Sequence, residues 1–335
     1  MKFFFVVGHA RSGTTMLGRI LGNHSDIHTF NELHFFDKVW KNTGAKTLSL
    51  EKSVDLLARL ICISQNNVFM QARYREYRDE ARSMLDHLDL PDYTELNIYR
   101  LFVTYTAREQ QKTVACEHTP QYIFHLEEVF DSLGEIKIIN LIRDPRDVIL
   151  SMKARWKGRA LSTRKRTFKM NLHAWVHYHP VFTSYLWKSS VEALDPYVHD
   201  ERIHTVKYED ILRYPENEIR KICTFLRISF LPEMLKVPMV GSSLVPDRPD
   251  EKGIDETRTA KWKSGGLNAT ELFLIQKFTQ PSMKRAGYEP VQSFPNLFLI
   301  LFYFMTLPLK ALLSLLLQIK DLKRLSHAIR RRLRG

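Results

Sequence analysis

The stretch "VVGHARSGTT", residues 6–15, decides the fold of this chain. Residues 2–7 are apolar without alternation, which predicts a strand buried on both faces. Residues 8–13 form a predicted loop. From Thr14 onward, apolar residues recur at helical spacing until Gly22, namely Met16, Leu17, Ile20 and Leu21. The loop therefore leads into a helix N-terminus, where N–H groups and the helix dipole bind anions.

The loop has the glycine spacing of a nucleotide-hydrolysing P-loop, with Gly8 and Gly13 separated by four residues, but it lacks the lysine. Two threonines follow Gly13, and the nearest cation is Arg11. Such a hydrolase also needs an acidic residue at the end of another strand to hold Mg²⁺. Here the second strong strand, 136–142, is followed by Arg143, which attracts anions and repels a metal. The sequence therefore favours a phosphate-like ligand without a metal over a kinase or nucleoside triphosphatase.

The remaining sequence predicts an α/β fold. Strands are expected at 2–7, 112–116, 136–142 and 202–210, and helices at 48–112 with a break at Pro91, 120–132, 164–190, 211–227 and 269–285. Residues 238–268, rich in Gly, Ser, Pro, Asp and Lys, predict a long surface loop. Alternating strands and helices indicate a central parallel sheet flanked by helices, with a P-loop-like topology. Ligands of such sheets bind at the carboxyl ends of the strands.

Composition limits the compartment and the partners. The 335 residues carry a net charge of +13, which suits an anionic ligand. Three widely spaced cysteines form neither a disulfide framework nor a metal cluster and fit a reducing compartment. The apolar N-terminal run is too short for a secretory signal, so we expect a cytoplasmic protein. The basic and aromatic stretch at 74–82 is interpreted as one face of a helix, and no nucleic acid is expected as a partner.

Two motifs together resemble a known family. "RSGTTML" (11–17) and "LIRDPRDVILS" (141–151) are similar to the sulfotransferases that use 3′-phosphoadenosine 5′-phosphosulfate (PAPS). The resemblance extends to "VKYEDIL" (206–212) and, more weakly, to "RTAKWKSGGL" (258–267) and "AGYEP" (286–290), and so covers about residues 2–290. It is strongest to the RSGTT-type branch, which includes tyrosylprotein and carbohydrate sulfotransferases. The resemblance implies a sulfotransferase domain at 1–290.

The resemblance also implies the nucleotide-binding residues. The 5′-phosphosulfate would be bound by Arg11 and by the backbone of Ser12, Gly13, Thr14 and Thr15. Arg143 and Ser151 would hold the 3′-phosphate. Tyr208 would contact the nucleotide, and Arg258 and Lys261 would close over it. A sulfuryl group carries one negative charge less than a phosphoryl group, so no metal is expected.

Two residues are candidates for the chemistry. Glu32 follows Arg11 by 21 residues, as the base glutamate does in the tyrosylprotein branch, while His34 is a weaker contender. His118, in "CEHTP", stands where related sequences have lysine. A protonated His118 would stabilise the leaving phosphate, and a neutral one could act as the base. The expected acceptor is a hydroxyl or amine of a glycan, lipid or small molecule. A nucleotide-binding scaffold without transferase activity is the alternative.

The C-terminal tail, 291–335, has a different character. Residues 294–319 are strongly apolar but contain Pro308 and Lys310, which favours two short helices lying in one membrane leaflet over a span. Residues 320–334 are basic and suit anionic headgroups. The sequence thus predicts a membrane-attached tail. The alternatives are a helical hairpin packed on the rest of the chain and a dimer contact.

Overall fold

The computed structural model describes residues 1–41, 46–86, 92–156, 175–176, 178–241, 244 and 247–317. Strand β1 (Lys2–Gly8) lies at the centre of its architecture. Because side chains alternate along a strand, Phe3 and Phe5 pack into one hydrophobic cluster and Phe4 and Val6 into another, on the opposite face. All four side chains are buried. The prediction of a strand covered on both faces is confirmed.

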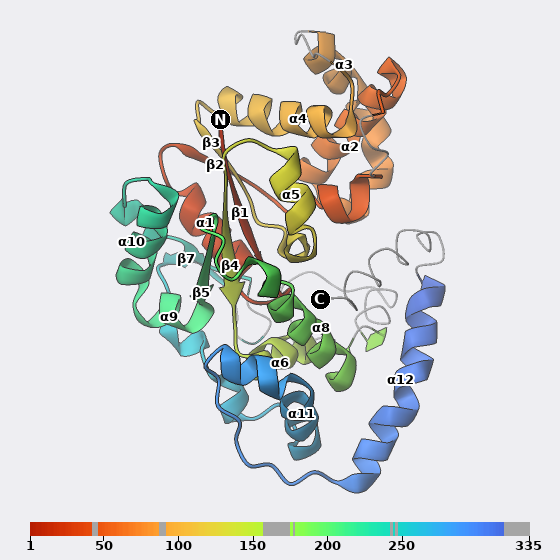
Figure 1. Ribbon diagram of the computed structural model, residues 1–335, viewed down its shortest axis with the longest axis vertical. Coiled ribbons are helices and arrows are strands. Elements are labelled where there is room, and N and C mark those ends of the chain that lie inside the picture. Colours follow the sequence, from red (N-terminus) through yellow and green to blue (C-terminus); the bar gives the residue numbers. More distant parts are fainter. Residues whose placement is uncertain are drawn as a thin grey trace.

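Five parallel strands form the sheet in the order β2-β3-β1-β4-β5 (Figure 1). The bounds of the other four are β2 (Ile27–Phe30), β3 (Val114–Glu117), β4 (Ile136–Ile142) and β5 (Ile203–Lys207). The short β2 was not predicted, because its sequence, "IHTF", contains no apolar run. β1 pairs with β3 and β4, so the loops that follow these three strands meet at one edge.

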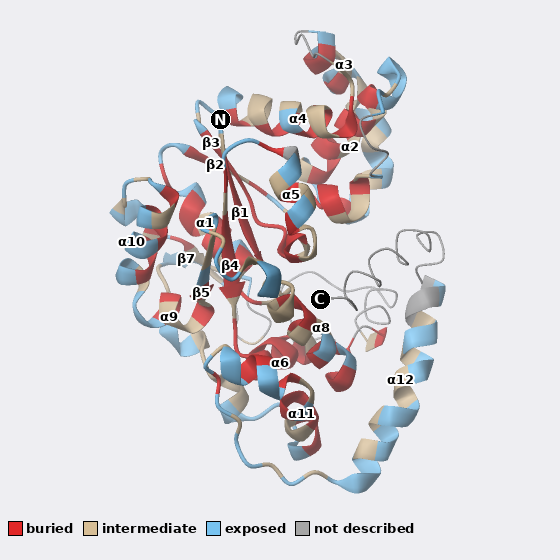
Figure 2. Ribbon diagram, viewed as in Figure 1, coloured by how far each residue is buried: buried red, intermediate tan, exposed pale blue. Residues whose placement is uncertain are grey.

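Helices cover both faces of the sheet (Figures 1 and 2). The hydrophobic cluster on one face includes α2 (Leu50–Gln65), α4 (Glu95–Glu109) and α5 (Leu126–Ser132), and α3 (Arg78–Asp86) extends it by packing on α2. The other face packs against α1 (Thr14–Gly22), α9 (Tyr208–Arg213) and α10 (Pro215–Leu226). Beyond the carboxyl edge lie α6 (Pro145–Trp156), α8 (Pro180–Glu192) and α11 (Ala269–Arg285). The predicted α/β class is therefore confirmed.

Several predicted boundaries were wrong. The strand expected at 202–210 ends at Lys207, and α9 begins with Tyr208. The helix expected at 211–227 is interrupted at Tyr214, because the following proline disfavours the helical conformation of the residue before it. The helix expected at 164–190 includes His179, which is extended for the same reason, and α8 begins only at Pro180. Residues 157–174 lie outside the described part.

The predicted surface loop at 238–268 has more structure than its composition indicated. It contains a two-stranded antiparallel sheet of β6 (Pro238–Met239) and β7 (Arg248–Lys252). Two 3₁₀ turns follow, Glu256–Arg258 and Lys261–Ser264. Other short 3₁₀ segments occur at Val68–Tyr77, Pro120–Phe124, Asp195–Tyr197 and Pro232–Leu235.

The apolar tail forms one helix, α12 (Leu297–Leu317), rather than the two short helices expected. Pro308 lies within it. The charge of Lys310 is tolerated in this apolar helix because its ammonium donates to the carbonyls of Trp175 (3.1 Å) and Tyr178 (2.7 Å) on the protein body. Within the described ranges, no helix is both long and apolar enough to cross a membrane. The basic residues 318–335 lie outside the described part.

Candidate active site

A cavity of about 460 Å³ opens at the carboxyl edge of the sheet. Three regions far apart in sequence contribute to its wall: the loop after β1, the helix α6 and the loop at 240–261. Of the predicted site residues, those that line it are Arg11, Gly13, Thr14, Thr15, Glu32, Arg143, Ser151, Tyr208, Arg258 and Lys261. Ser12 and His118 do not. The fold thus brings nearly all of the predicted residues to one place.

The loop after β1 needs glycine at position 13. Gly13 precedes α1 with φ at 100°, a left-handed conformation that side chains rarely adopt. A Cβ there would also lie 2.5 Å from the ring of Tyr208. The loop therefore turns sharply and presents the N-terminus of α1 to the cavity. The N–H of Ser12 is used within this turn, where it donates to the carbonyl of His9 (3.1 Å).

Three guanidinium groups, those of Arg11, Arg143 and Arg155, converge on the cavity. Burial, followed by repulsion from Arg155 and Arg143, lowers the pKa of Arg11 to about 10. Arg11 also has φ at 74°, which is unusual for a residue with a side chain. Of the three, Arg143 is buried, Arg11 is half-buried and Arg155 is exposed. Like charges held close together favour binding of a ligand with several negative charges, which would relieve their repulsion.

Two of these arginines, Arg11 and Arg143, are fixed in direction by contacts across the cavity. Arg11 Nε donates to Ser151 Oγ (3.3 Å), and Arg143 Nη1 donates to the carbonyl of Arg11 (3.1 Å). Arg143 also lies over the ring of Tyr208, 4.4 Å from its centroid, and donates to the carbonyl of Arg258 (3.3 Å). The two predicted phosphate motifs are therefore in direct contact through their side chains.

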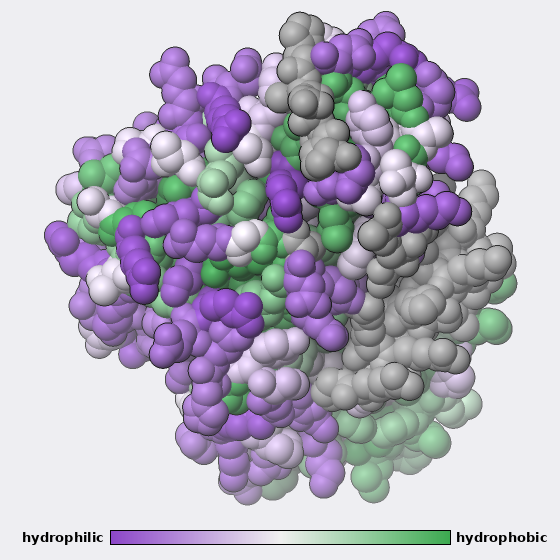
Figure 3. Space-filling view, turned by 45° about the horizontal axis from the view of Figure 1, so that its top comes forward, coloured by the Kyte–Doolittle hydropathy of each residue, from purple (hydrophilic) through white to green (hydrophobic). Residues whose placement is uncertain are grey.

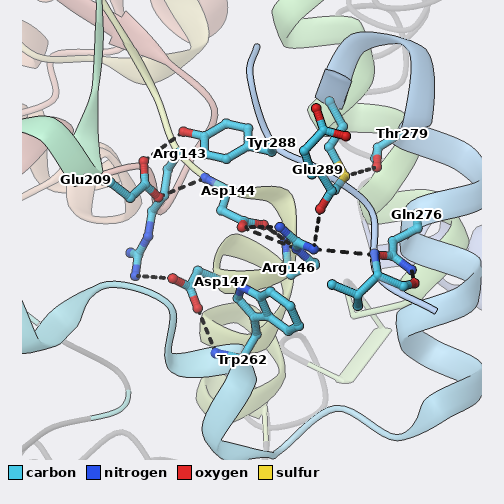
Figure 4. A network of polar contacts seen from close by, with 12 residues as sticks. Arg143, Asp144, Arg146, Asp147, Glu209, Trp262, Gln276, Thr279, Tyr288 and Glu289 are labelled. Atoms are coloured by element: carbon cyan, nitrogen blue, oxygen red, sulfur yellow. Dashed lines mark hydrogen bonds and ion pairs between the residues drawn. The ribbon is translucent and has the colours of Figure 1, made fainter. Parts of the chain in front are cut away.

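A buried polar network holds the "RDPRD" turn that follows β4 (Figure 4). Arg146 pairs with Asp144 (2.7 Å) and stacks on Trp262 at 3.9 Å from the ring centroid. Glu209 accepts hydrogen bonds from the N–H of Asp144 (3.0 Å) and from the hydroxyl of Tyr288 (2.7 Å). The network joins the turn to the "KWKS" and "AGYEP" segments, so these weaker motifs pack behind the turn that carries Arg143.

The opposite wall carries three hydrogen-bonded side chains, those of Glu32, His34 and Asp37. Residues 32–35, which include the predicted base Glu32, are called the base segment below. His34 contacts Glu32 through Nε2 (3.1 Å) and Asp37 through Nδ1 (3.0 Å). Burial lowers the pKa of His34, but its hydrogen bonds to Asp37 and Glu32 raise it to about 9. At neutral pH the imidazolium donates to both carboxylates. Burial in turn raises the pKa of Glu32, but the hydrogen bond and charge of His34 outweigh it and place this pKa below its ordinary value.

His118 lies just outside this wall. Its ring packs against α1 at Gly18, where a Cβ would lie 2.3 Å from His118 Cδ2. Burial lowers the pKa of His118, so the neutral form prevails at neutral pH. A neutral ring does not provide the positive charge that stabilisation of a leaving phosphate requires, although the neighbouring charge of Glu32 favours protonation.

Some lining residues were missed by the sequence analysis. Arg155 follows Ser151 by four residues on α6 and so lies on the same helix face, a spacing that could have revealed it. Arg19, Lys38 and Phe69 also line the cavity, but no local pattern marks them. Within the described ranges, no three His, Cys, Asp or Glu side chains are grouped as a metal site would require.

Comparison with known proteins agrees with this geometry. A family model described as "Sulfotransferase family" matches residues 4–232. A sulfotransferase domain from the Synechococcus PCC 7002 olefin synthase is 22% identical with a TM-score of 0.55, covering 86% of this chain and 95% of that one. A sulfotransferase domain from the curacin biosynthetic pathway is 20% identical with a TM-score of 0.52, covering 86% and 98%. No curated protein matches. The fold is therefore that of the sulfotransferases.

Replacing Arg143 tests the predicted nucleotide contact. We expect Arg143→Ala to weaken binding of adenosine 3′,5′-bisphosphate by about 1.5–3 kcal/mol, the usual value of a charge-assisted hydrogen bond. Calorimetric titration measures this affinity directly. Adenosine 5′-monophosphate, which lacks the 3′-phosphate, is the matched control ligand and should lose much less. Equal losses for both nucleotides, or no loss for either, would contradict the assignment.

Proposed function

The chain belongs to the sulfotransferase family, and from this premise we propose that it transfers a sulfuryl group from PAPS to a hydroxyl or amine of an acceptor. The observation that carries the proposal is the convergence of Arg11, Arg143 and Arg155 on one cavity. PAPS has a phosphosulfate at one end and a 3′-phosphate at the other, so its charges match a site with cations spread along it. An acceptor with a glycan, lipid or small-molecule hydroxyl is compatible with a cavity of this size.

The residues present fit the two ends of PAPS. Thr14 and Thr15 begin α1, where backbone N–H groups would hold the phosphosulfate together with Arg11. Arg143 and Ser151 would hold the 3′-phosphate. Arg258 and Lys261 come from a loop that could close over the nucleotide and exclude water.

Glu32 is the proposed general base. When bound, PAPS supplies the sulfuryl group. The acceptor oxygen or nitrogen forms a bond to sulfur, the bond from sulfur to the 5′-phosphate oxygen breaks, and the acceptor proton passes to the carboxylate of Glu32. His34 keeps that carboxylate ionised and fixes its direction. Arg11 and the N–H groups of α1 would stabilise the charge on the departing adenosine 3′,5′-bisphosphate.

Replacing Glu32 tests the proposed base. We expect Glu32→Gln to keep its affinity for adenosine 3′,5′-bisphosphate and to lower kcat by about 10²–10⁴-fold, the usual contribution of a positioned base. Turnover with labelled PAPS, using a lipid and metabolite extract as the acceptor, measures this change. His118→Lys is the comparison variant. If Glu32→Gln keeps full turnover while His118→Lys has none, His118 is the base.

We expect turnover without a divalent metal. Arg143 occupies the strand end where a metal-binding carboxylate would stand in a nucleoside triphosphatase, and its charge opposes a cation there. Turnover should therefore be the same in EDTA as in Mg²⁺. Loss of activity in EDTA that Mg²⁺ restores would contradict this expectation.

A second part of the proposal is that α12 lies on an anionic membrane surface. Its large apolar side chains are exposed, namely Leu297, Phe298, Leu299, Leu301, Phe302, Phe304, Met305, Leu309, Leu312 and Leu316. They gather at the lower right of the space-filling view, where α12 lies (Figure 3). Lys310 and the hydrogen bond from His179 to the carbonyl of Tyr303 (2.9 Å) hold the helix against the body. Seven basic residues and one Asp follow in residues 320–334.

These features favour lipid over protein as the partner of α12. An apolar helix followed by a basic segment is suited to a surface with an apolar interior and anionic headgroups. Each Lys or Arg near such a surface contributes about 1 kcal/mol. The helix would then lie in the plane of the interface, with its apolar side chains in the lipid.

Vesicle sedimentation tests the membrane proposal. The full chain should sediment with vesicles that contain phosphatidylserine and much less with pure phosphatidylcholine. Phe298→Glu and Met305→Glu together should abolish sedimentation, because both side chains are exposed on α12. Val198→Glu, at an exposed apolar site on the body, is the matched control and should still sediment. The alternative outcome is a stable dimer that does not sediment with vesicles and that dissociates in the α12 variant. This result would overturn the proposal and assign the helix to a contact with a second copy of the chain.

A further inference from the structure

A buried carboxyl group lies behind the base segment and takes no part in the chemistry described above. Glu117 is the last residue of β3 and is 3% exposed. Its Oε2 accepts from the hydroxyl of Tyr99 (2.5 Å), and its Oε1 accepts from the hydroxyl of Thr119 (2.5 Å). Oε1 also accepts from the backbone N–H of Leu33 (3.1 Å). The carboxyl group therefore joins β3, α4 and the base segment.

The network around Glu117 binds consecutive backbone groups of the base segment. The N–H of Leu33 donates to Glu117 itself. The N–H of His34 donates to Thr119 Oγ1 (3.5 Å), and the N–H of Phe35 donates to the hydroxyl of Tyr122 (2.7 Å). Three successive backbone N–H groups thus donate hydrogen bonds to side chains of β3 and of the turn after it. Because the network fixes backbone rather than side chains, it sets the position from which Glu32 and His34 reach the cavity.

The backbone of the base segment needs such support. His34 has φ at 52° and ψ at 32°, the left-handed conformation, which costs about 1–3 kcal/mol for a residue with a side chain. The hydrogen bonds on either side of His34 offset this cost. In that conformation the imidazole reaches both Glu32 and Asp37. An extended His34 would turn its ring away from one of them.

We propose that Glu117 is a positioning residue that holds the base segment in its strained conformation and thereby aims Glu32 at the acceptor. It lies outside the cavity lining, so it acts through the backbone of residues 33–35 and not on the substrate. The effect on turnover rests on the proposed function, whereas the effect on the backbone of residues 33–35 does not.

The chemistry of the site supports this role. Burial raises the pKa of Glu117 to about 7, although hydrogen bonds from Thr119, Tyr99, Tyr122 and the backbone of Leu33 lower it. A buried carboxyl group is costly, and a leucine there would pack without that cost. What a leucine lacks is the ability to accept the N–H of Leu33 and two hydroxyls at once.

Amide hydrogen exchange tests the proposal without using activity. We expect Glu117→Gln to speed exchange of residues 33–35 at least tenfold, because glutamine replaces one of the two acceptor oxygens by a donor and so cannot keep all three hydrogen bonds that Glu117 accepts. The matched control is Glu209→Gln. Glu209 likewise accepts one backbone N–H and one tyrosine hydroxyl, but its partners are Asp144 and Tyr288. That variant should leave exchange at 33–35 unchanged.

Turnover and binding complete the test. If Glu117 positions the base, Glu117→Gln should lower kcat by about 10–100-fold, the range expected for a displacement of about 1 Å, with unchanged affinity for adenosine 3′,5′-bisphosphate. Native exchange at 33–35 in Glu117→Gln would overturn the proposal. If the wild-type chain shows no turnover, the proposed function fails, but the exchange result still decides whether Glu117 holds the segment.

Conservative variants cover the case in which Glu117→Gln does not fold. Tyr122→Phe removes the acceptor of the Phe35 N–H together with a hydrogen bond to Glu117, and Thr119→Val removes the acceptor of the His34 N–H together with the hydroxyl that donates to Glu117. Each should speed exchange in the base segment and lower kcat in the same direction. Tyr288→Phe, which removes a tyrosine bonded to Glu209, is their matched control and should leave exchange at 33–35 unchanged. Unchanged exchange and kcat in both variants would overturn the proposal.

Discussion

The structure depends on a single constraint, which is that β1 is buried on both faces and bonded on both edges. Because both faces and both edges of β1 are covered, the chain reaches the cavity only where β1 ends. Gly8 allows the chain to turn out of the sheet there, since a Cβ at this position would lie 2.4 Å from the carbonyl oxygen of Leu141. Everything that reaches the cavity is arranged around this exit. Strand β4 ends beside it, since Gly8 pairs with Leu141 and Arg143 follows two residues later, while β3 ends at Glu117, level with Phe5.

The two sides of the cavity differ in their electrostatics: one gathers positive charges, and the other places a histidine between two carboxylates. On the β4 side, three guanidinium groups lie close together, and surrounding contacts fix the directions of Arg11 and Arg143. Asp144, Arg146 and Glu209 hold the turn, and Arg143, which lines the cavity, also pairs with Asp147 at 3.9 Å (Figure 4). The site is thereby ready for a polyanion, and charge that would be unfavourable in the free chain becomes binding energy when the ligand arrives.

On the β3 side, the carboxylate of Glu32, the proposed base, must stay ionised and correctly aimed. His34 lies between Glu32 and Asp37 with its pKa raised to about 9, so a positive charge sits between two negative ones. The strained backbone that allows this arrangement is supported by Glu117 and its neighbours. The strained backbone at His34 is thus stabilised by a buried hydrogen-bond network behind it. Such support is common where the geometry of a site must be exact to a fraction of an ångström.

The sequence alone determined the class of the fold, and it predicted most of the residues that the structure brings together in the lining of one cavity. Uniformly apolar strands, a glycine turn and the "RDPRD" turn are local signals, because burial on both faces and sharp turns restrict residues within a few positions of each other. It did not reveal β2, the start of α8 or the single helix α12, whose signals are short or conflict with proline. Nor did it reveal Arg155, the conformation of His34 or the role of Glu117. Those depend on side chains that are up to 140 positions apart in the chain and meet only after the sheet has formed. Contacts of that kind are fixed by packing and by the need to satisfy every buried polar group, which only the tertiary structure can decide.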